Sequence, residues 1–142
     1  MMNEEVRSIM SKDVRTVSPK DTVEQVSQLM QRERLQQLPV VDAYGLLVGL
    51  VTSYDLWRCS ARPDCKADGP VSEIMTTHVV KLAPKDKVGT AAELFMDRRF
   101  KTLPVVNLRN ELKGVVTAFD VIRYTMKKEY PEPILYREVL AT

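Results

Sequence analysis

Apolar and polar positions follow a strand period and then a helix period, and this alternation occurs twice along the chain. Residues 14–17 are extended and β-branched, and they end at the turn signal Ser18-Pro19. From Asp21 to about Arg34, apolar residues recur at helical spacing. Asp21 and Glu24 have the spacing of a capping box, so the pattern predicts a helix that begins at Asp21.

A β-hairpin and a second helix are predicted next. Residues 38–41 form a short apolar run whose Pro39 lies near its start, where a strand can spare a donor. Residues 42–45 have turn composition, and residues 46–51 return as an apolar strand. A helix from Ser53 to about Arg58 completes the order β-α-β-β-α.

The stretch from Val6 to Arg58 recurs from Val71 to Arg123 without a gap, at a constant offset of 65 residues. Twenty of the fifty-three aligned positions are identical, and they gather in IM, PKD, LPVV and G-x-V-T-x-x-D. The second copy therefore predicts strands at 79–82, 103–106 and 112–116, with helices at 88–99 and from 118 to about 129.

One copy of about 55 residues is marginal as an independent fold. We therefore expect a single α/β module in which two β-α-β-β-α units pack sheet to sheet about a pseudo-twofold axis. Its parts are unit one at 6–59, a connector at 60–70, unit two at 71–129 and a tail at 130–142. Apolar residues of the tail, such as Ile134 and Leu135, favour docking on this module or on a partner.

Composition narrows the class of protein. A net charge of +2 is too weakly basic to favour nucleic acid as a partner, and Lys127 and Lys128 also fit a solvated helix face. The chain has no run of about 18 apolar residues, and its start is acidic and polar, which indicates a cytoplasmic protein without a membrane span. Cys59 and Cys65 are then expected as reduced thiols, and a single histidine does not favour a metal site.

The twin motif Thr-x-x-Asp, at Thr52 and Asp55 and again at Thr117 and Asp120, is the candidate for chemistry. It fits a capping box, with the arginine three residues beyond each Asp as an ion-pair partner. It also fits a nucleotide site, because a helix N-terminus attracts phosphate and a carboxylate accepts hydrogen bonds from a ribose diol.

The IM start, LPVV and G-x-x-T-x-x-D, twice in the same order, resemble the CBS domain, arranged as a tandem pair (a Bateman module). The resemblance covers both copies and excludes the tail. It implies a disc-like pair with two clefts for adenosyl ligands such as AMP, ATP, NAD or S-adenosylmethionine. In the family, each cleft combines Thr and Asp of one copy with the first strand and the segment around LPVV of the other.

Transferred to this chain, the resemblance implies two sets of ligand-binding residues. The first cleft would combine Thr52, Ser53 and Asp55 with Val79, Val80, Phe100, Lys101 and Leu103. The second would combine Thr117, Ala118 and Asp120 with Val14, Arg15, Thr16, Leu35, Gln36 and Leu38. The first cleft contains Ser53, Lys101 and Phe100 where the second contains Ala118, Gln36 and Leu35. We therefore expect nucleotides with longer phosphate chains to prefer the first cleft.

The resemblance implies a regulator that senses a nucleotide and acts on a separate protein or through its own oligomer. The sequence contains no P-loop, dinucleotide fingerprint or Cys–His pair at a plausible spacing, so we do not expect an enzyme. The alternatives are a structural dimerisation module without a ligand, or nucleic-acid binding. We expect a homodimer formed through helical faces near Leu29, Met30, Leu94 and Phe95.

Overall fold

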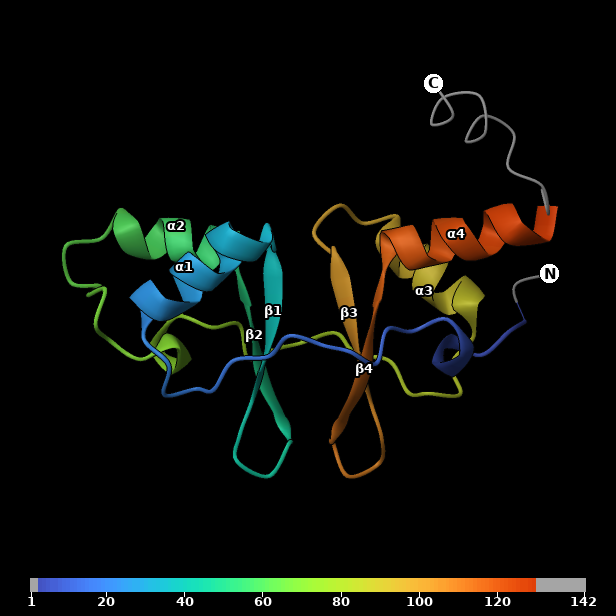
Figure 1. Cartoon of the computed structure of the whole chain (residues 1–142), viewed down its shortest axis with the longest axis horizontal. Coiled ribbons are helices and arrows are strands. Elements are labelled where there is room, and N and C mark those ends of the chain that lie inside the picture. Colours follow the sequence, from blue (N-terminus) through green and yellow to red (C-terminus); the bar gives the residue numbers. More distant parts are fainter. Residues whose placement is uncertain (1–2, 130–142) are drawn as a thin grey trace, which may run out of the picture.

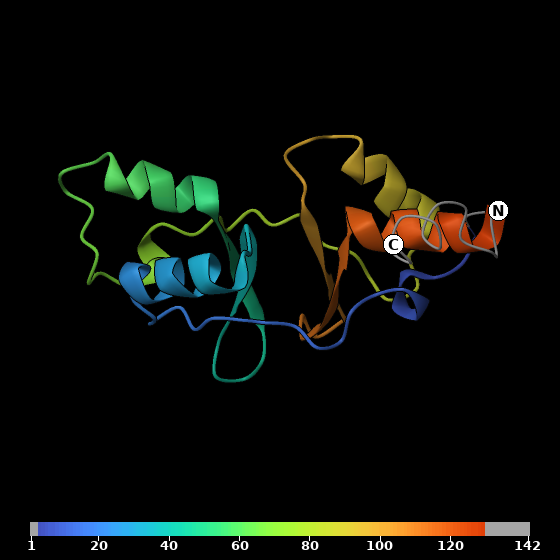
Figure 2. The same ribbon diagram turned by 45° about the horizontal axis from the view of Figure 1, so that its top comes forward.

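The computed structural model describes residues 3–129, and within them the two copies form two similar halves placed side by side (Figures 1 and 2). Each half contains one antiparallel hairpin and two α-helices, with the hairpins at the centre and the helices toward the outside. The expected fold class is confirmed. The elements are η1 Val6–Ser8, α1 Val23–Glu33, β1 Gln37–Val41, β2 Leu47–Thr52, α2 Ser53–Ser60, η2 Val71–Glu73, α3 Val88–Phe95, β3 Thr102–Val106, β4 Leu112–Thr117 and α4 Ala118–Glu129. The docking predicted for the tail lies outside the described residues.

The first strand predicted in each copy is wrong. Residues 14–17 and 79–82 form no strand, and each segment makes only one parallel bridge, Val17 with Val40 and Leu82 with Val105. Each bridge is held by two backbone hydrogen bonds, such as Val17 N–H to the Pro39 carbonyl at 3.1 Å. The partner strands β1 and β3 each contain a proline, whose carbonyl accepts a hydrogen bond but whose nitrogen cannot donate one. A longer ladder of hydrogen bonds along β1 or β3 would therefore be interrupted.

Two helix boundaries differ from the prediction. Thr22 and not Asp21 caps α1, in a reciprocal capping box with Gln25. The Asp21 carboxylate instead accepts the Ser18 N–H at 2.9 Å and closes the preceding turn. The predicted helix 88–99 ends at Phe95, because the Asp97 carboxylate accepts the Arg99 N–H and offers the backbone a turn in place of the helix.

The two halves exchange their first segments. Val6 of η1, from the first copy, is fully buried in the core of the second half with Leu82, Val88 and Leu103. Val71 of η2 is buried in the core of the first half in the same way. Each half therefore cannot complete its core alone, which favours one cooperative module.

The exchanged segments cross the opposite hairpin very closely at Gly49 and Gly114. A Cβ at Gly49 would lie 2.5 Å from the Met75 sulfur, and one at Gly114 would lie 2.7 Å from the Met10 sulfur. Leu50 and Thr76 exchange two backbone hydrogen bonds beside the first crossing. The glycines of the repeated motif thus permit the exchange, a role that the sequence pattern alone does not reveal.

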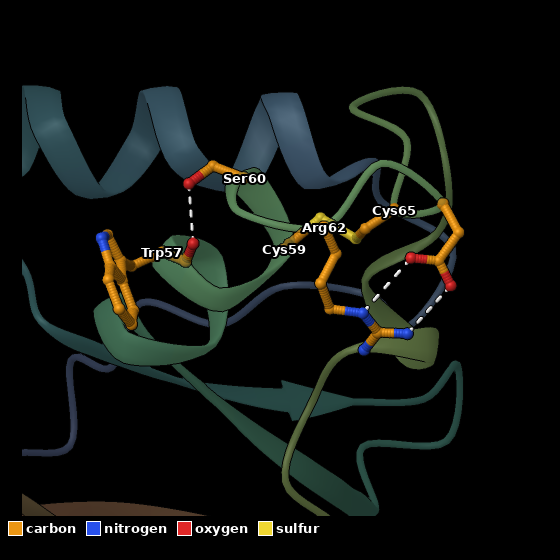
Figure 3. Close-up of a disulfide and its surroundings, with 6 residues drawn as sticks. Trp57, Cys59, Ser60, Arg62 and Cys65 are labelled. Atoms are coloured by element: carbon orange, nitrogen blue, oxygen red, sulfur yellow. Dashed lines mark hydrogen bonds and ion pairs between the residues drawn. A yellow bond between two sulfur atoms is a disulfide. The ribbon is translucent and has the colours of Figure 1, made fainter.

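The two cysteines are not free thiols, so that prediction is wrong. A disulfide joins Cys59, buried in the last turn of α2, to Cys65 in the connector (Figure 3). The connector folds back over the end of α2 and brings the two Cα atoms within 5.2 Å, a separation that a disulfide can span. Beside it, Arg62 pairs with Asp64 at 3.0 Å, and this contact lowers the pKa of the Asp64 carboxyl.

The apolar residues predicted to lie near a dimer face are buried or half-buried. Met30 is buried, and Leu29, Leu94 and Phe95 pack against the two cores. The large apolar side chains exposed on helices α2 and α4 are Tyr54, Trp57, Phe119, Ile122 and Met126. No helix within residues 3–129 is both long and apolar enough to cross a membrane.

Candidate functional site

The repeated Thr-x-x-Asp motif forms a reciprocal capping box in both copies. Thr52 precedes α2, its side-chain oxygen accepts the Asp55 N–H at 3.0 Å, and the Asp55 carboxylate accepts the Thr52 N–H at 2.9 Å. Thr117 and Asp120 make the same pair of bonds at 3.2 and 2.9 Å. The capping interpretation is therefore confirmed, which leaves open whether the same groups also bind a ligand.

The predicted ion pairs between each Asp and the following arginine are absent from the described residues. The Arg58 guanidinium lies instead over the Tyr54 ring, 5.8 Å from its centre. Arg123 lies over the Phe119 ring at 4.6 Å. Because neither arginine neutralises its neighbouring aspartate directly, the carboxylate charge of the motif remains available to another partner.

A cavity of about 790 Å³, the Asp55 cleft, lies between the two copies. It brings together residues of the first copy around the start of α2 and residues of the second copy from the segments before β3. Seven of the eight residues predicted for the first cleft line it: Thr52, Ser53, Asp55, Val79, Val80, Phe100 and Lys101. The eighth, Leu103, is fully buried in the core of the second half.

Nine further residues line the Asp55 cleft and were not predicted for it: Gln36, Gln37, Leu50, Tyr54, Arg58, Thr76, His78, Arg99 and Thr102. The sequence could have indicated some of these residues as part of the cleft. Tyr54 and Arg58 belong to the same helix as Asp55, and His78 directly precedes the predicted Val79. Thr76 is brought in by the exchanged segment, which the sequence does not indicate.

The Asp55 carboxylate is the buried acid of this cleft, with only 8% of the residue exposed. Its Oδ2 accepts the Thr52 N–H at 2.9 Å and the Thr76 hydroxyl at 3.5 Å. Its Oδ1 accepts no hydrogen bond from residues 3–129. One oxygen thus holds the helix cap, and the other can accept a hydrogen bond from a ligand.

Cationic side chains line the rest of the Asp55 cleft. Arg58 comes from α2, while Arg99 and Lys101 come from the segment that leads into β3. Arg99 is paired with Asp97 at 2.7 Å, and the hydrogen bond from Arg99 lowers the pKa of Asp97 to about 2. Lys101 is exposed and has no ion-pair partner among the described residues, so its charge is free for an anion.

The residues predicted for the second cleft do not share any of the cavities that we describe in residues 3–129. None of the five cavities that we describe in residues 3–129 joins Asp120 to the predicted opposite side. Leu38 is buried in the core of the first half, Leu35 packs against it, and Gln36 lines the Asp55 cleft. Val14 is half-buried and Thr16 is exposed, while Thr117 and Ala118 are half-buried at the start of α4.

Arg15, predicted for the second cleft, forms a bidentate pair with Glu33 at the end of α1. The hydrogen bond from Arg15 lowers the pKa of the Glu33 carboxyl and raises that of Arg15 itself. The guanidinium is therefore already neutralised, in contrast to Lys101 at the Asp55 cleft. The two repeats thus differ in the charge that they offer near their Thr-x-x-Asp motifs.

Comparisons with known proteins give one consistent result. A model of the CBS domain matches residues 6–56 and 71–127. The chain is 31% identical over 124 residues to the CBS domain-containing protein YhcV of Bacillus subtilis, covering 87% of both chains. It also matches a homoserine O-acetyltransferase of Methanohalobium evestigatum at 32% identity, but spans only 23% of that enzyme.

Two solved structures resemble the fold closely. CBSX2 in complex with AMP superposes with a TM-score of 0.80 at 25% identity, over 88% of this chain and 98% of that one. The CBS domain pair of MJ0100, in complex with 5'-methylthioadenosine and S-adenosylmethionine, gives 0.74 at 26% identity over the same shares. This chain belongs to the CBS domain family, as a tandem pair of CBS domains.

Proposed function

We propose that the Asp55 cleft binds an adenosine nucleotide and that the protein is a sensor of that ligand. The observation that carries the proposal is the buried Asp55 carboxylate, whose Oδ1 accepts no protein hydrogen bond although the residue lines a cavity. An acceptor that faces a cavity and receives no protein hydrogen bond favours a ligand hydroxyl, and the two hydroxyls of a ribose are suited to it.

Other residues of the Asp55 cleft are suited to the base and the phosphate group of a nucleotide. Phe100 is half-buried and offers an apolar ring for stacking an adenine, with Val79 and Val80 beside it. Lys101 and the Ser53 hydroxyl are suited to phosphate oxygens. The Ser53 N–H is already bonded to the Gln36 carbonyl at 2.8 Å, so phosphate recognition rests on side chains more than on this backbone donor.

The similar structures support the same ligand class. One contains AMP, and the other contains 5'-methylthioadenosine and S-adenosylmethionine, which share an adenosine group. The ligand of this chain is proposed to share that group. Lys101 and Ser53 favour a phosphorylated ligand over a sulfonium compound, because a sulfonium would place a cation beside the free lysine.

We propose further that the module is regulatory and not catalytic, with the bound nucleotide changing its contacts to a partner or to a second copy. Tyr54 and Trp57 on α2, with Phe119 and Ile122 on α4, are more than half exposed and lie at matching positions of the two repeats. Apolar side chains repeated in this way favour a homodimer. Sedimentation at micromolar concentration tests this point, and a monomer with and without nucleotide contradicts it.

The binding proposal is tested by thermal unfolding with AMP. Ligand at about a hundred times its dissociation constant should stabilise the fold by about 2.7 kcal/mol. Asp55→Asn keeps an acceptor for the helix cap but removes the charge, and it should lose most of this gain. Asp120→Asn makes the same change in the other repeat and should keep it. Equal gains in both variants would exclude the Asp55 charge as the determinant of binding, and no gain in the wild type would favour the alternative of a structural module.

A further inference from the structure

A second pair of pockets lies where α2 and α4 meet the exchanged 3-10 helices. The α2 pocket is lined by Asp55, Arg58, Cys59, Arg62, Glu73 and Ile74. The α4 pocket is lined by Ser8, Ile9, Asp120, Arg123, Tyr124, Lys127 and Lys128. The offset of 65 residues carries all six residues of the α2 pocket onto six of the seven residues of the α4 pocket. The two pockets are therefore related by the internal repeat.

The pockets differ in size and charge. The α2 pocket has a volume of about 120 Å³, and its two arginines are balanced by Asp55 and Glu73. The α4 pocket has a volume of about 540 Å³, and Ser8 replaces Glu73 there. Arg123, Lys127 and Lys128 carry three positive charges against the single charge of Asp120. The α4 pocket is thus larger and strongly cationic, while its counterpart is small and neutral.

Contacts around the α2 pocket restrict it further. Arg62 is bound by Asp64, and the disulfide of Cys59 fixes the connector beside it (Figure 3). In the α4 pocket, Arg123 and Lys128 lie over the rings of Phe119 and Tyr124, and neither forms an ion pair among the described residues. Arg123 and Lys128 are therefore positioned by aromatic rings but not neutralised by an ion pair.

We propose that the α4 pocket is a second ligand site, which binds the phosphate group of a small soluble molecule. The lining of the α4 pocket carries a net charge of +2, which favours a dianionic oxyanion over a carboxylate, because a single carboxylate would leave one positive charge unbalanced. The Ser8 hydroxyl donates to the Glu5 carbonyl at 2.7 Å, so its proton is not available to a ligand. Ser8 matters here because it replaces a negatively charged residue. The site is independent of the Asp55 cleft.

Lysines in the last turn of a helix also stabilise the helix itself. The test must therefore separate binding from folding, and amide chemical shifts do so. The full chain is titrated with inorganic pyrophosphate at constant ionic strength, set with chloride. We expect saturable shifts at the amides of Ser8, Ile9 and residues 123–128. Shifts that grow linearly, or that appear only at the Asp55 cleft, would overturn the proposal.

Repeat-matched variants make the test specific. Ser8→Glu installs the charge that Glu73 supplies in the α2 pocket, and we expect pyrophosphate affinity at the α4 amides to fall about tenfold or more. Lys127→Gln should weaken it in the same way. Arg62→Gln, the equivalent change in the α2 pocket, should leave it unaltered. Unchanged affinity in Ser8→Glu, with the fold intact by its amide spectrum, would refute the site. AMP binding at the Asp55 cleft is read separately at residues 52–55, so either site can fail alone.

Discussion

Gln37 and Thr102 occupy the same position in the two repeats, and they are bonded to each other. The Gln37 side-chain oxygen accepts the Thr102 N–H at 2.8 Å, and its nitrogen donates to the Arg99 carbonyl at 3.4 Å. A threonine side chain is too short to make the reverse contact, so the bond breaks the pseudo-twofold symmetry. It ties the segment that carries Phe100 and Lys101 to the first repeat, and it thereby shapes the Asp55 cleft.

Removing this bond should loosen the cleft. We expect Gln37→Ala to lower the free energy of unfolding by about 1 kcal/mol and to weaken AMP binding as well, because the segment 99–101 loses its anchor. Urea unfolding and calorimetry measure the two effects. Gln28→Ala is the matched control, since Gln28 is exposed on α1 and lies outside the cleft, and it should bind AMP normally. Full AMP affinity in Gln37→Ala would contradict the anchoring role.

Lys101 should determine how the affinity of the cleft depends on the length of the phosphate chain. We expect the wild type to bind ATP more tightly than AMP by about 1–2 kcal/mol. Lys101→Gln, which introduces the residue found at the equivalent Gln36 of the other repeat, should remove this preference. Calorimetric titration of both nucleotides measures the difference. Lys113→Gln removes an exposed lysine outside the cleft and should leave the preference intact. Tighter ATP binding in Lys101→Gln would contradict the assignment.

The two crossing glycines should respond unequally to alanine. At Gly114 a Cβ would lie 2.7 Å from the Ser11 backbone oxygen, whereas at Gly49 the shortest contacts are to the flexible Met75 side chain. We expect Gly114→Ala to cost about 2–3 kcal/mol and Gly49→Ala about 1 kcal/mol less than that. Chemical unfolding of both variants measures this. A larger cost at Gly49 would mean that the Met75 side chain cannot move aside.

The disulfide closes a short loop at the end of α2. With six residues of separation, its loss should lower the free energy of unfolding by about 2 kcal/mol in the chain-entropy account. Cys65→Ala and reduction of the wild type with dithiothreitol should give similar losses, measured by urea unfolding. Thiol titration of the unreduced, denatured protein should find no free thiol. Two free thiols there, or equal stability of both forms, would contradict a bridged native state.

The lowered pKa of Asp97 should affect the stability of the fold at acidic pH. The Arg99 hydrogen bond holds this pKa at about 2 in the fold, below the ordinary value of 3.8. A lowered carboxyl pKa stabilises the fold above the ordinary value, and that contribution disappears as the pH falls from 3.8 to about 2. Carbon-detected NMR titration should place the Asp97 midpoint near the lower value. In Arg99→Gln the midpoint should rise toward 3.8, and an unchanged midpoint would exclude Arg99 as the cause.

Local patterns determined much of this protein. The short apolar runs at 38–41 and 46–51, joined by a turn, specify a hairpin that the structure confirms, and Thr52 with Asp55 caps the following helix as the spacing indicates. These features depend on residues close in sequence, whose backbone preferences and hydrogen bonds act over a few positions. The repeat itself, with its Thr-x-x-Asp motif in both copies, was enough to identify the family resemblance, and seven of the residues predicted from it line the Asp55 cleft.

Tertiary structure alone decided the features that depend on long-range packing. Whether residues 14–17 become a strand depends on a partner that contains Pro39, and whether Cys59 meets Cys65 depends on the path of the connector. The inequality of the two predicted clefts has the same origin. Aligned residues such as Gln36 and Lys101 both line the Asp55 cleft, because each directly precedes a strand of the two hairpins at the centre of the molecule. A sequence repeat specifies equivalent positions, but side-chain length and packing across the axis decide which of them meet.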